Sequence, residues 1–132
     1  MLVDICAVED RRRWFTVERA GRVLAVFRDR DTAATVVVDG RCPHAGAPME
    51  DGWLHDGAVV CPWHRYRFSP RDGRCENNAR YRLPTYPTTV VNGRVIADVP
   101  FNPLGTAGYA GGSRRTQAAA ERADRDQVEG ME

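Results

Sequence analysis

The chain has 132 residues, 42% of them hydrophobic, and 19 basic against 18 acidic side chains give it a formal net charge of +1. This length fits one domain of ordinary size, and the longest apolar runs, such as Val36-Val37-Val38, are too short to span a membrane. The balanced charge argues against a nucleic acid partner, because proteins that coat nucleic acids carry a strong basic excess. The N-terminus lacks the basic and apolar regions of a secretory signal, so we expect a cytoplasmic protein.

Along the first hundred residues, short segments rich in Val, Ile, Thr and aromatic residues alternate with clusters of Gly, Pro, Asp and Asn. This pattern is typical of strands. Tight hairpin turns are predicted at Ala20-Gly21, Asp56-Gly57 and Asn92-Gly93, of which the last is the clearest, because a type I′ turn needs positive φ at both central positions. The sequence therefore predicts an all-β domain, either a small antiparallel barrel or a sandwich. The predicted strands cover residues 2–8, 14–19, 23–28, 34–39, 53–55, 58–61, 66–69, 86–91 and 94–98.

The composition changes at about residue 102. Beyond this point the only sizeable apolar side chains are Leu104, Tyr109, Val128 and Met131, and such a segment cannot form a core. We therefore predict a mostly disordered tail over residues 102–132, which either docks a partner or carries no function. Residues 116–128 have a helix-forming composition but no apolar stripe, so an isolated helix there would be marginal.

The four cysteines fall into two kinds. In a reducing compartment, cysteines are metal ligands, catalytic thiols or core residues more often than disulfide partners. Cys42 and Cys61 each have a histidine within three residues, whereas Cys6 and Cys75 do not, and we interpret the latter two as small buried hydrophobic residues. His55 lies at a predicted turn, and we interpret it as a surface residue that binds no metal.

Two short motifs carry the chemistry of the chain. Cys42-Pro43-His44 and Cys61-Pro62-Trp63-His64 each offer one thiolate and one imidazole. This donor set suits a [2Fe–2S] cluster in which two thiolates hold one iron and two neutral imidazoles hold the other. A structural zinc site is the first alternative, but zinc modules normally use C-x-x-C or paired histidines on a helix. The second alternative, that these residues only pack, fits poorly with histidines in loops rich in Pro and Gly.

Residues 42–49 (Cys-Pro-His-Ala-Gly-Ala-Pro-Met) and 61–75 (Cys-Pro-Trp-His-Arg-Tyr-Arg-Phe-Ser-Pro-Arg-Asp-Gly-Arg-Cys) resemble the two cluster-binding loops of Rieske-type ferredoxins. The resemblance implies a β domain of three small antiparallel sheets over residues 1–101. A cluster-binding subdomain would occupy about residues 41–84 and hold one [2Fe–2S] cluster.

The resemblance also implies a role for each ligand. Cys42 and Cys61 would hold the buried iron, and His44 and His64 would hold the outer iron that accepts the electron. The ring edges of the two histidines would face solvent and the partner. The family usually has glycine directly after the second histidine, where this sequence has Arg65.

Residues near the ligands receive roles from the same resemblance. Pro43 would stiffen the first loop, and Trp63 would shield the cluster from water. High-potential Rieske proteins carry two extra cysteines at the positions of Ala47 and Trp63, and hydroxyl donors at the positions of Tyr66 and Phe68. Because this sequence lacks all four features, we predict a potential in the lowest third of the roughly −150 to +300 mV that Rieske centres span.

We expect the position of Arg65 to need no positive φ. In an extended stretch, Arg65 and Arg67 would share one face beside His64. They would form either a basic rim for an acidic partner or an ordinary solvated face.

The implied activity is one-electron transfer by a carrier protein that is not itself an enzyme. As a ferredoxin component it would pass electrons from a flavin-dependent reductase to a terminal oxygenase. The alternative is the small subunit of an assimilatory NAD(P)H-dependent nitrite reductase. We do not expect a stand-alone oxygenase, because the residues after 100 leave no room for a mononuclear-iron domain. No nucleic acid or membrane partner is predicted.

Overall fold

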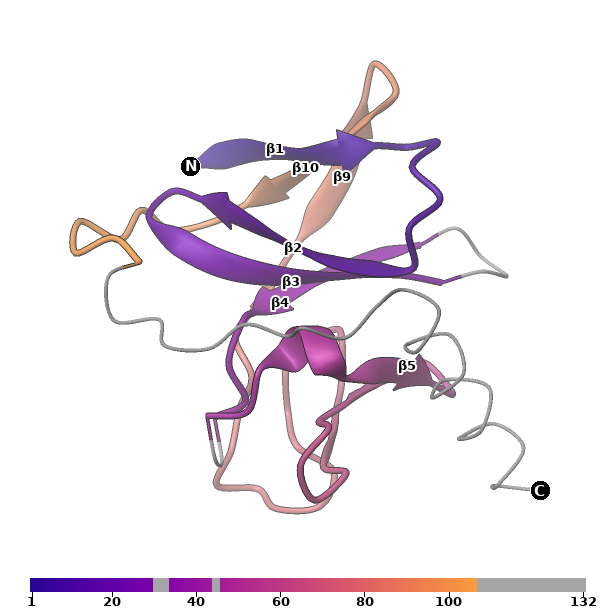
Figure 1. Ribbon diagram of the computed structural model, residues 1–132, viewed down its shortest axis with the longest axis vertical. Helices are drawn as coiled ribbons and strands as arrows, with labels where there is room; N and C mark the ends of the chain where they lie inside the picture. Colours follow the sequence, from indigo (N-terminus) through magenta and orange to yellow (C-terminus); the bar gives the residue numbers. More distant parts are fainter. Residues whose placement is uncertain (30–33, 44–45, 107–132) are drawn as a thin grey trace.

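The computed structural model of the chain describes residues 1–29, 34–43 and 46–106. Within these ranges the chain forms three small antiparallel sheets (Figure 1), which confirms the all-β prediction. The same ranges contain no helix long and apolar enough to cross a membrane. The elements in chain order are β1 (Leu2–Ala7), β2 (Trp14–Arg19), β3 (Arg22–Arg28), β4 (Thr35–Asp39), the 3-10 turn η1 (Met49–Asp51), β5 (Trp53–His55), β6 (Ala58–Val60), β7 (Arg67–Phe68), β8 (Thr85–Tyr86), β9 (Thr88–Val91) and β10 (Arg94–Asp98).

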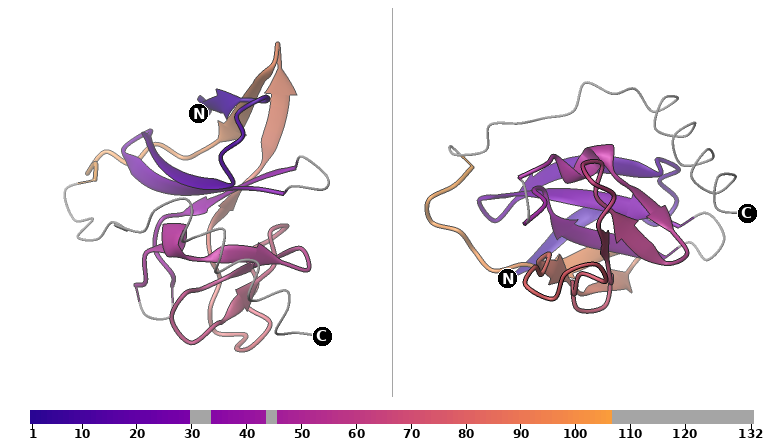
Figure 2. Two further views of the ribbon diagram at one scale, coloured as in Figure 1. Left: turned by 45° about the vertical axis from the view of Figure 1, so that its right-hand side comes forward. Right: turned by 90° about the horizontal axis from the view of Figure 1, so that it is seen from below.

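The four-stranded sheet, ordered β2-β3-β4-β8, lies between the sheets β1-β10-β9 and β5-β6-β7 (Figure 2). A hydrophobic core lies on each face of this sheet. Strand β3 contributes to both cores, because successive side chains of a strand point to opposite faces of the sheet. Leu24 and Val26 pack into the core shared with β1 and β10. Ala25 and Phe27 pack into the other core, which also contains both predicted cysteine ligands.

The three predicted hairpin turns are confirmed. Ala20, Asp56 and Asn92 have φ angles of 54°, 49° and 50°, and each is followed by a glycine with positive φ. Gly21 is required for a second reason, because a Cβ atom there would lie 2.2 Å from the carbonyl oxygen of Asn102. The first turn therefore forms part of a contact with the end of the domain.

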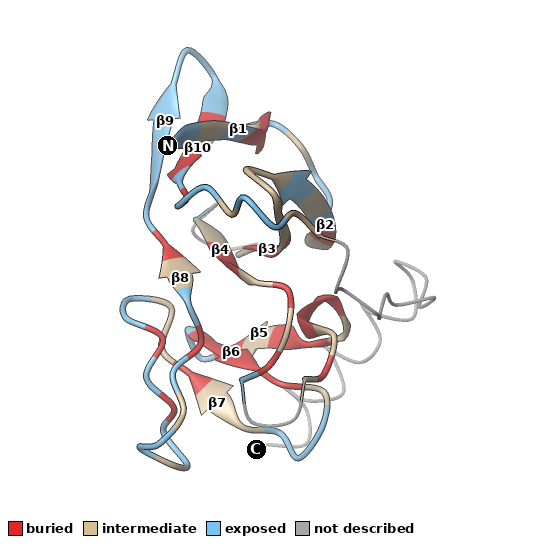
Figure 3. Ribbon diagram, turned by 90° about the vertical axis from the view of Figure 1, so that its left-hand side faces the viewer, coloured by how far each residue is buried: buried red, intermediate tan, exposed pale blue. Residues whose placement is uncertain are grey.

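The predicted strand at residues 86–91 is in fact two strands in two different sheets. Strand β8 pairs with β4 in the middle sheet, whereas β9 pairs with β10 in the outer sheet. Pro87 separates them, and proline has no backbone N–H to donate to a ladder. The chain changes sheets at this residue, and all four residues of β9 are exposed (Figure 3).

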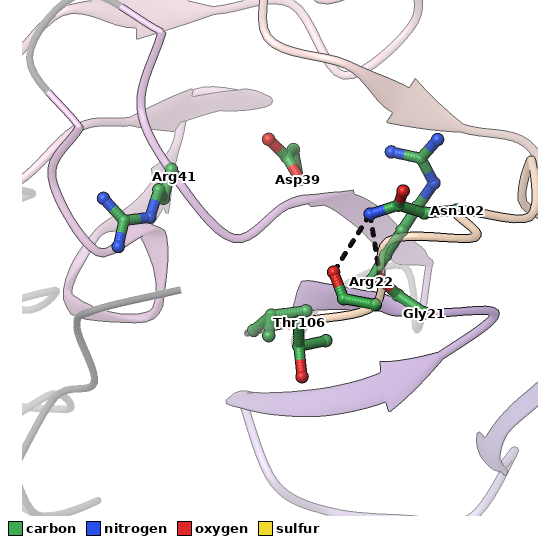
Figure 4. Close-up of a pocket in the computed structure, with 8 residues that line it drawn as sticks. Gly21, Arg22, Asp39, Arg41, Asn102 and Thr106 are labelled. Carbon is green, nitrogen blue, oxygen red and sulfur yellow. Dashed lines mark hydrogen bonds between the residues drawn. The ribbon is translucent and has the colours of Figure 1, made fainter. Parts of the chain in front are cut away.

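The ordered fold continues beyond residue 101. The backbone N–H of Asn102 donates to the carbonyl oxygen of Ala20 at 2.8 Å. Its side-chain Nδ2 donates to the carbonyl oxygens of Gly21 and Gly105 at 3.2 and 3.1 Å (Figure 4). The hydrogen-bonded structure therefore extends past the predicted boundary at residue 101, because composition does not reveal that one asparagine binds the carbonyls of a distant turn. The remainder of the predicted tail, with residues 116–128, lies outside the described residues.

Candidate metal centre

Two loops of equal size form the candidate centre. The first follows β4 and the second follows β6. In each loop, the backbone N–H of a cysteine donates to the carbonyl oxygen five residues further on. Cys42 donates to Ala47 and Cys61 donates to Tyr66, and both bonds measure 2.8 Å. Each closed loop thus begins at a buried cysteine, and in the second loop Trp63, His64 and Arg65 are exposed.

The structure brings the two predicted thiolate ligands together. Cys42 and Cys61 are 1% and 0% exposed and belong to the same core. A hydrogen bond with the Cys42 thiol, together with burial, raises the pKa of Cys61 above its ordinary value, although the backbone N–H of Trp63 donates to Cys61 and opposes this. Two thiolates cannot both be charged in an apolar core without a cation to compensate them. A metal supplies that charge and deprotonates its thiol ligands.

His64 lies in the second loop, three residues beyond Cys61. Its side chain is exposed, and both His64 and Arg65 have left-handed backbone conformations, with φ angles of 65° and 56°. The prediction that Arg65 needs no positive φ is therefore wrong. A loop that reverses direction and closes between Cys61 and Tyr66 needs residues in this region, which is why glycine suits the position.

His44, the fourth predicted ligand, lies outside the described residues, and Pro43 before it is exposed. Among residues 1–29, 34–43 and 46–106, no three His, Cys, Asp or Glu side chains are grouped so that they could hold a metal ion. The donors that are described comprise two adjacent buried thiols and one exposed imidazole. This arrangement fits a two-iron cluster whose thiolate and imidazole ligands bind different irons.

The neighbouring residues are arranged around the cysteines. Ala47 and Phe68 are fully buried in the core that contains both thiols. Tyr66 is half-buried, with its ring centroid 6.5 Å from that of His64. Trp63 is 48% exposed, and it touches the site through its backbone N–H, which donates to Cys61.

Arg67 does not form a basic rim with Arg65. Its Nε lies 2.7 Å from a carboxylate oxygen of Glu76, and its Nη2 donates to the carbonyl oxygen of His55 at 3.1 Å. The predicted shared face assumed an extended chain, and the left-handed Arg65 breaks that alternation. Arg65 itself is exposed in the loop that carries His64.

His55 is buried, with 6% of its surface exposed, so its interpretation as a surface residue is wrong. The turn consists of Asp56-Gly57, and His55 is the last residue of β5, on the same buried face as Trp53. The sequence signal for this burial was the position of His55 two residues after Trp53 in a predicted strand, because such residues share one face of the sheet. The other two cysteines, Cys6 and Cys75, are buried as predicted, in different cores.

Comparison with known proteins identifies the class. Residues 2–87 match the Rieske [2Fe-2S] domain family, so the chain belongs to that family and binds a [2Fe–2S] cluster. Over 99 residues, 70% of this chain, it is 34% identical to the oxygenase component of chloroacetanilide N-alkylformylase from Rhizorhabdus wittichii. The chain spans only 28% of that relative's length.

Shorter proteins are also similar. The ferredoxin subunit of 3-phenylpropionate/cinnamic acid dioxygenase from Escherichia coli is 37% identical over 65 residues, which are 48% of this chain and 61% of the subunit. A Mycobacterium tuberculosis structure, described as an NADH-dependent nitrite reductase small subunit, has 27% identity and a TM-score of 0.66, covering 74% of this chain and 93% of that one. The ferredoxin of carbazole 1,9a-dioxygenase from Nocardioides aromaticivorans, at 21% identity and a TM-score of 0.64, shares the fold over 76% of this chain and 98% of its own.

Proposed function

We propose that this chain is a cytoplasmic one-electron carrier that passes electrons from a flavin-dependent reductase to a terminal oxygenase and is not itself an enzyme. The observation that carries the proposal is the pair of equal loops, which places two buried thiols beside each other and His64 on the surface. A Rieske cluster supplies a reversible one-electron couple. The chain supplies a buried anchor and an exposed ligand that a partner can approach.

We assign the ligands accordingly. Cys42 and Cys61 hold the inner iron, and His44 and His64 hold the outer one. The Rieske domain occupies residues 1–101, extended by residues 102–106 through the contacts of Asn102 with the first turn, and its cluster-binding subdomain occupies about residues 41–84. The likeness to a dioxygenase ferredoxin subunit supports the assignment of a carrier.

A second candidate function is the small subunit of an assimilatory NAD(P)H-dependent nitrite reductase. It is favoured by the likeness to the Mycobacterium tuberculosis structure, of which this chain covers 93%. In that case the electron acceptor would be a large sirohaem subunit instead of an oxygenase.

The test has two arms. In the first, the cluster-loaded protein is titrated anaerobically with dithionite, and we expect the uptake of one electron per chain. No uptake, or uptake of two electrons, would contradict a one-electron carrier. In the second, the full chain is isolated from its native cell and its bound proteins are identified by mass spectrometry. A flavoprotein with an oxygenase supports the first function, and a sirohaem subunit supports the second.

A further inference from the structure

Two arginines lie directly opposite each other beside the candidate centre. Arg74 and Arg82 pair in an isolated antiparallel bridge, which puts their side chains on the same face with Cβ atoms about 4.5–5.5 Å apart. The backbone holds them there: the N–H of Leu83 donates to the carbonyl oxygen of Gly73 at 2.8 Å. A Cβ atom at Gly73 would lie 1.8 Å from the carbonyl oxygen of Leu83. Like charges directly opposite each other destabilise a pair of strands.

Among the described residues, Asp72 is the carboxylate that lies beside this pair. The Nε of Arg74 lies 3.5 Å from a carboxylate oxygen of Asp72, and the Nε of Arg82 donates to the Asp72 backbone carbonyl at 3.0 Å. The N–H of Arg74, followed by the charges of both arginines, lowers the pKa of Asp72, so this group is ionised at neutral pH. Arg74 and Arg82 thus contribute two positive charges, and Asp72 contributes one negative charge.

The donors of the two guanidinium groups are largely unused. The closest contact of each arginine with Asp72 is made by Nε, and within the described part of the chain the terminal amino groups of Arg74 and Arg82 donate no hydrogen bond. Such groups are well suited to a carboxylate, which a guanidinium binds through two parallel N–H···O bonds.

These arginines flank a pocket. Its volume is about 350 Å³, and Arg74, Cys75, Ala79, Tyr81 and Arg82 line it. The side chains of Arg74 and Arg82 are exposed. The pocket therefore places two positively charged side chains beside Cys75, Ala79 and Tyr81, which suits the carboxylate of a glutamate or aspartate on another protein.

The pocket is also connected to the outer ligand. The ring centroid of Tyr81 lies 6.1 Å from that of Tyr66, and Tyr66 lies 6.5 Å from His64. Three aromatic rings in succession thus lead from the pocket wall to a residue that we assign to the outer iron.

We propose that Arg74 and Arg82 form a docking site for a surface carboxylate of the electron-transfer partner, next to the aromatic series Tyr81, Tyr66 and His64. This inference rests on the proposed carrier function. When the partner is seated, one electron passes between it and the outer-ligand side of the centre. No covalent bond forms or breaks.

The experiment uses small oxidants of opposite charge in place of the partner. The cluster-loaded protein is reduced with dithionite, freed of excess reductant and mixed anaerobically at low salt with an oxidant. Tris(oxalato)cobaltate(III) is a trianion with carboxylate oxygens on its surface, whereas hexaamminecobalt(III) is a trication. The variants are R74Q, R82Q and the double variant. The control is R71Q, which removes an exposed arginine of the same segment that does not line the pocket.

We expect R74Q and R82Q each to slow oxidation by the oxalato complex about two- to five-fold, as for exposed ion pairs, and the double variant to slow it about ten-fold if the two effects add. R71Q should leave this rate nearly unchanged, and none of these variants should slow oxidation by the ammine complex. R74K and R82K keep the charge but lose the planar fork, so their rates should fall between those of the wild type and the Gln variants. Iron content and the visible spectrum should match the wild type in every variant.

An effect of R71Q as large as that of R74Q would overturn the docking site, because it would reflect net charge alone. A double variant as fast as the wild type would also overturn it. Failure of the carrier function is a separate outcome, because then even the wild type would take up no electron from dithionite.

Discussion

The backbone N–H of Cys61 donates to the carbonyl oxygen of Tyr66 at 2.8 Å, and this bond closes the second loop with His64 and Arg65 between its ends. Both enclosed residues have left-handed backbone conformations. An L-residue other than glycine adopts this region at a cost of about 1–2 kcal/mol. The loop that presents His64 is therefore strained at Arg65.

Replacing Arg65 by glycine should relieve that strain. We expect Arg65→Gly to raise the free energy of unfolding of the cluster-loaded protein by about 1 kcal/mol, measured in urea, because glycine adopts positive φ without steric cost. Arg65→Ala is the matched control, since it removes the same charge and keeps the strain. If Ala stabilises the protein as much as Gly, the backbone is not the cause.

Each predicted ligand should be indispensable to the cluster. Aerobically purified wild-type protein should be red-brown, with two irons and two acid-labile sulfides per chain, and zinc without visible absorption would contradict the assignment. Alanine at Cys42, His44, Cys61 or His64 should abolish or severely reduce iron binding and destabilise the surrounding subdomain, because metal binding is coupled to folding. Iron and sulfide analysis provides the measurement.

His55 is the control among the histidines. Because it is buried, we expect His55→Ala to destabilise the protein by about 1–3 kcal/mol through the cavity that it leaves. The His55→Ala variant should still hold two irons per chain. Loss of iron in His55→Ala, with iron retained in His64→Ala, would reverse the ligand assignment.

Salt should slow electron transfer to an anionic partner. At 0.1 M the Debye length is about 10 Å, so exposed charges steer less well as salt rises. Arg67 is paired with Glu76, so Arg65 is the arginine to test for steering. We expect Arg65→Glu to slow oxidation by tris(oxalato)cobaltate(III) while iron content stays constant. Arg67→Gln should mainly lower stability. An oxidation rate that does not change with salt would contradict a role of Arg65 in attracting an anionic partner.

The reduction potential should fall in the lowest third of the roughly −150 to +300 mV range of Rieske centres, as measured by voltammetry. Phe68 is fully buried in the core with Cys42 and Cys61, and it offers no donor there. We expect Tyr66→Ser and Phe68→Tyr to raise the potential, because a hydrogen bond to a charged acceptor contributes about 1.5–3 kcal/mol. For a one-electron couple this corresponds to tens of millivolts or more.

Phe68→Leu serves as the control for this effect, because it changes the packing without adding a hydroxyl, and it should not raise the potential. A wild-type midpoint well above zero would mean that other donors, such as backbone N–H groups, outweigh the missing hydroxyls.

Features that depend on neighbouring residues could be predicted from the amino-acid sequence. The three hairpin turns follow from Gly preceded by Ala, Asp or Asn, because the required positive φ is a local property. The position of a histidine near each of Cys42 and Cys61 likewise predicted the donor set, since ligand chemistry resides in residue type and spacing. These local signals were enough to predict strands, turns and the kind of metal centre.

Features that depend on segments distant in sequence became visible in the folded chain. The left-handed Arg65 follows from the closure of its loop onto the core, and the burial of His55 follows from the pleat of β5. The opposition of Arg74 and Arg82 exists because Gly73 lets one segment approach Leu83 closely. Such contacts cannot be predicted from residue composition, because each arises when two distant segments pack against a common core.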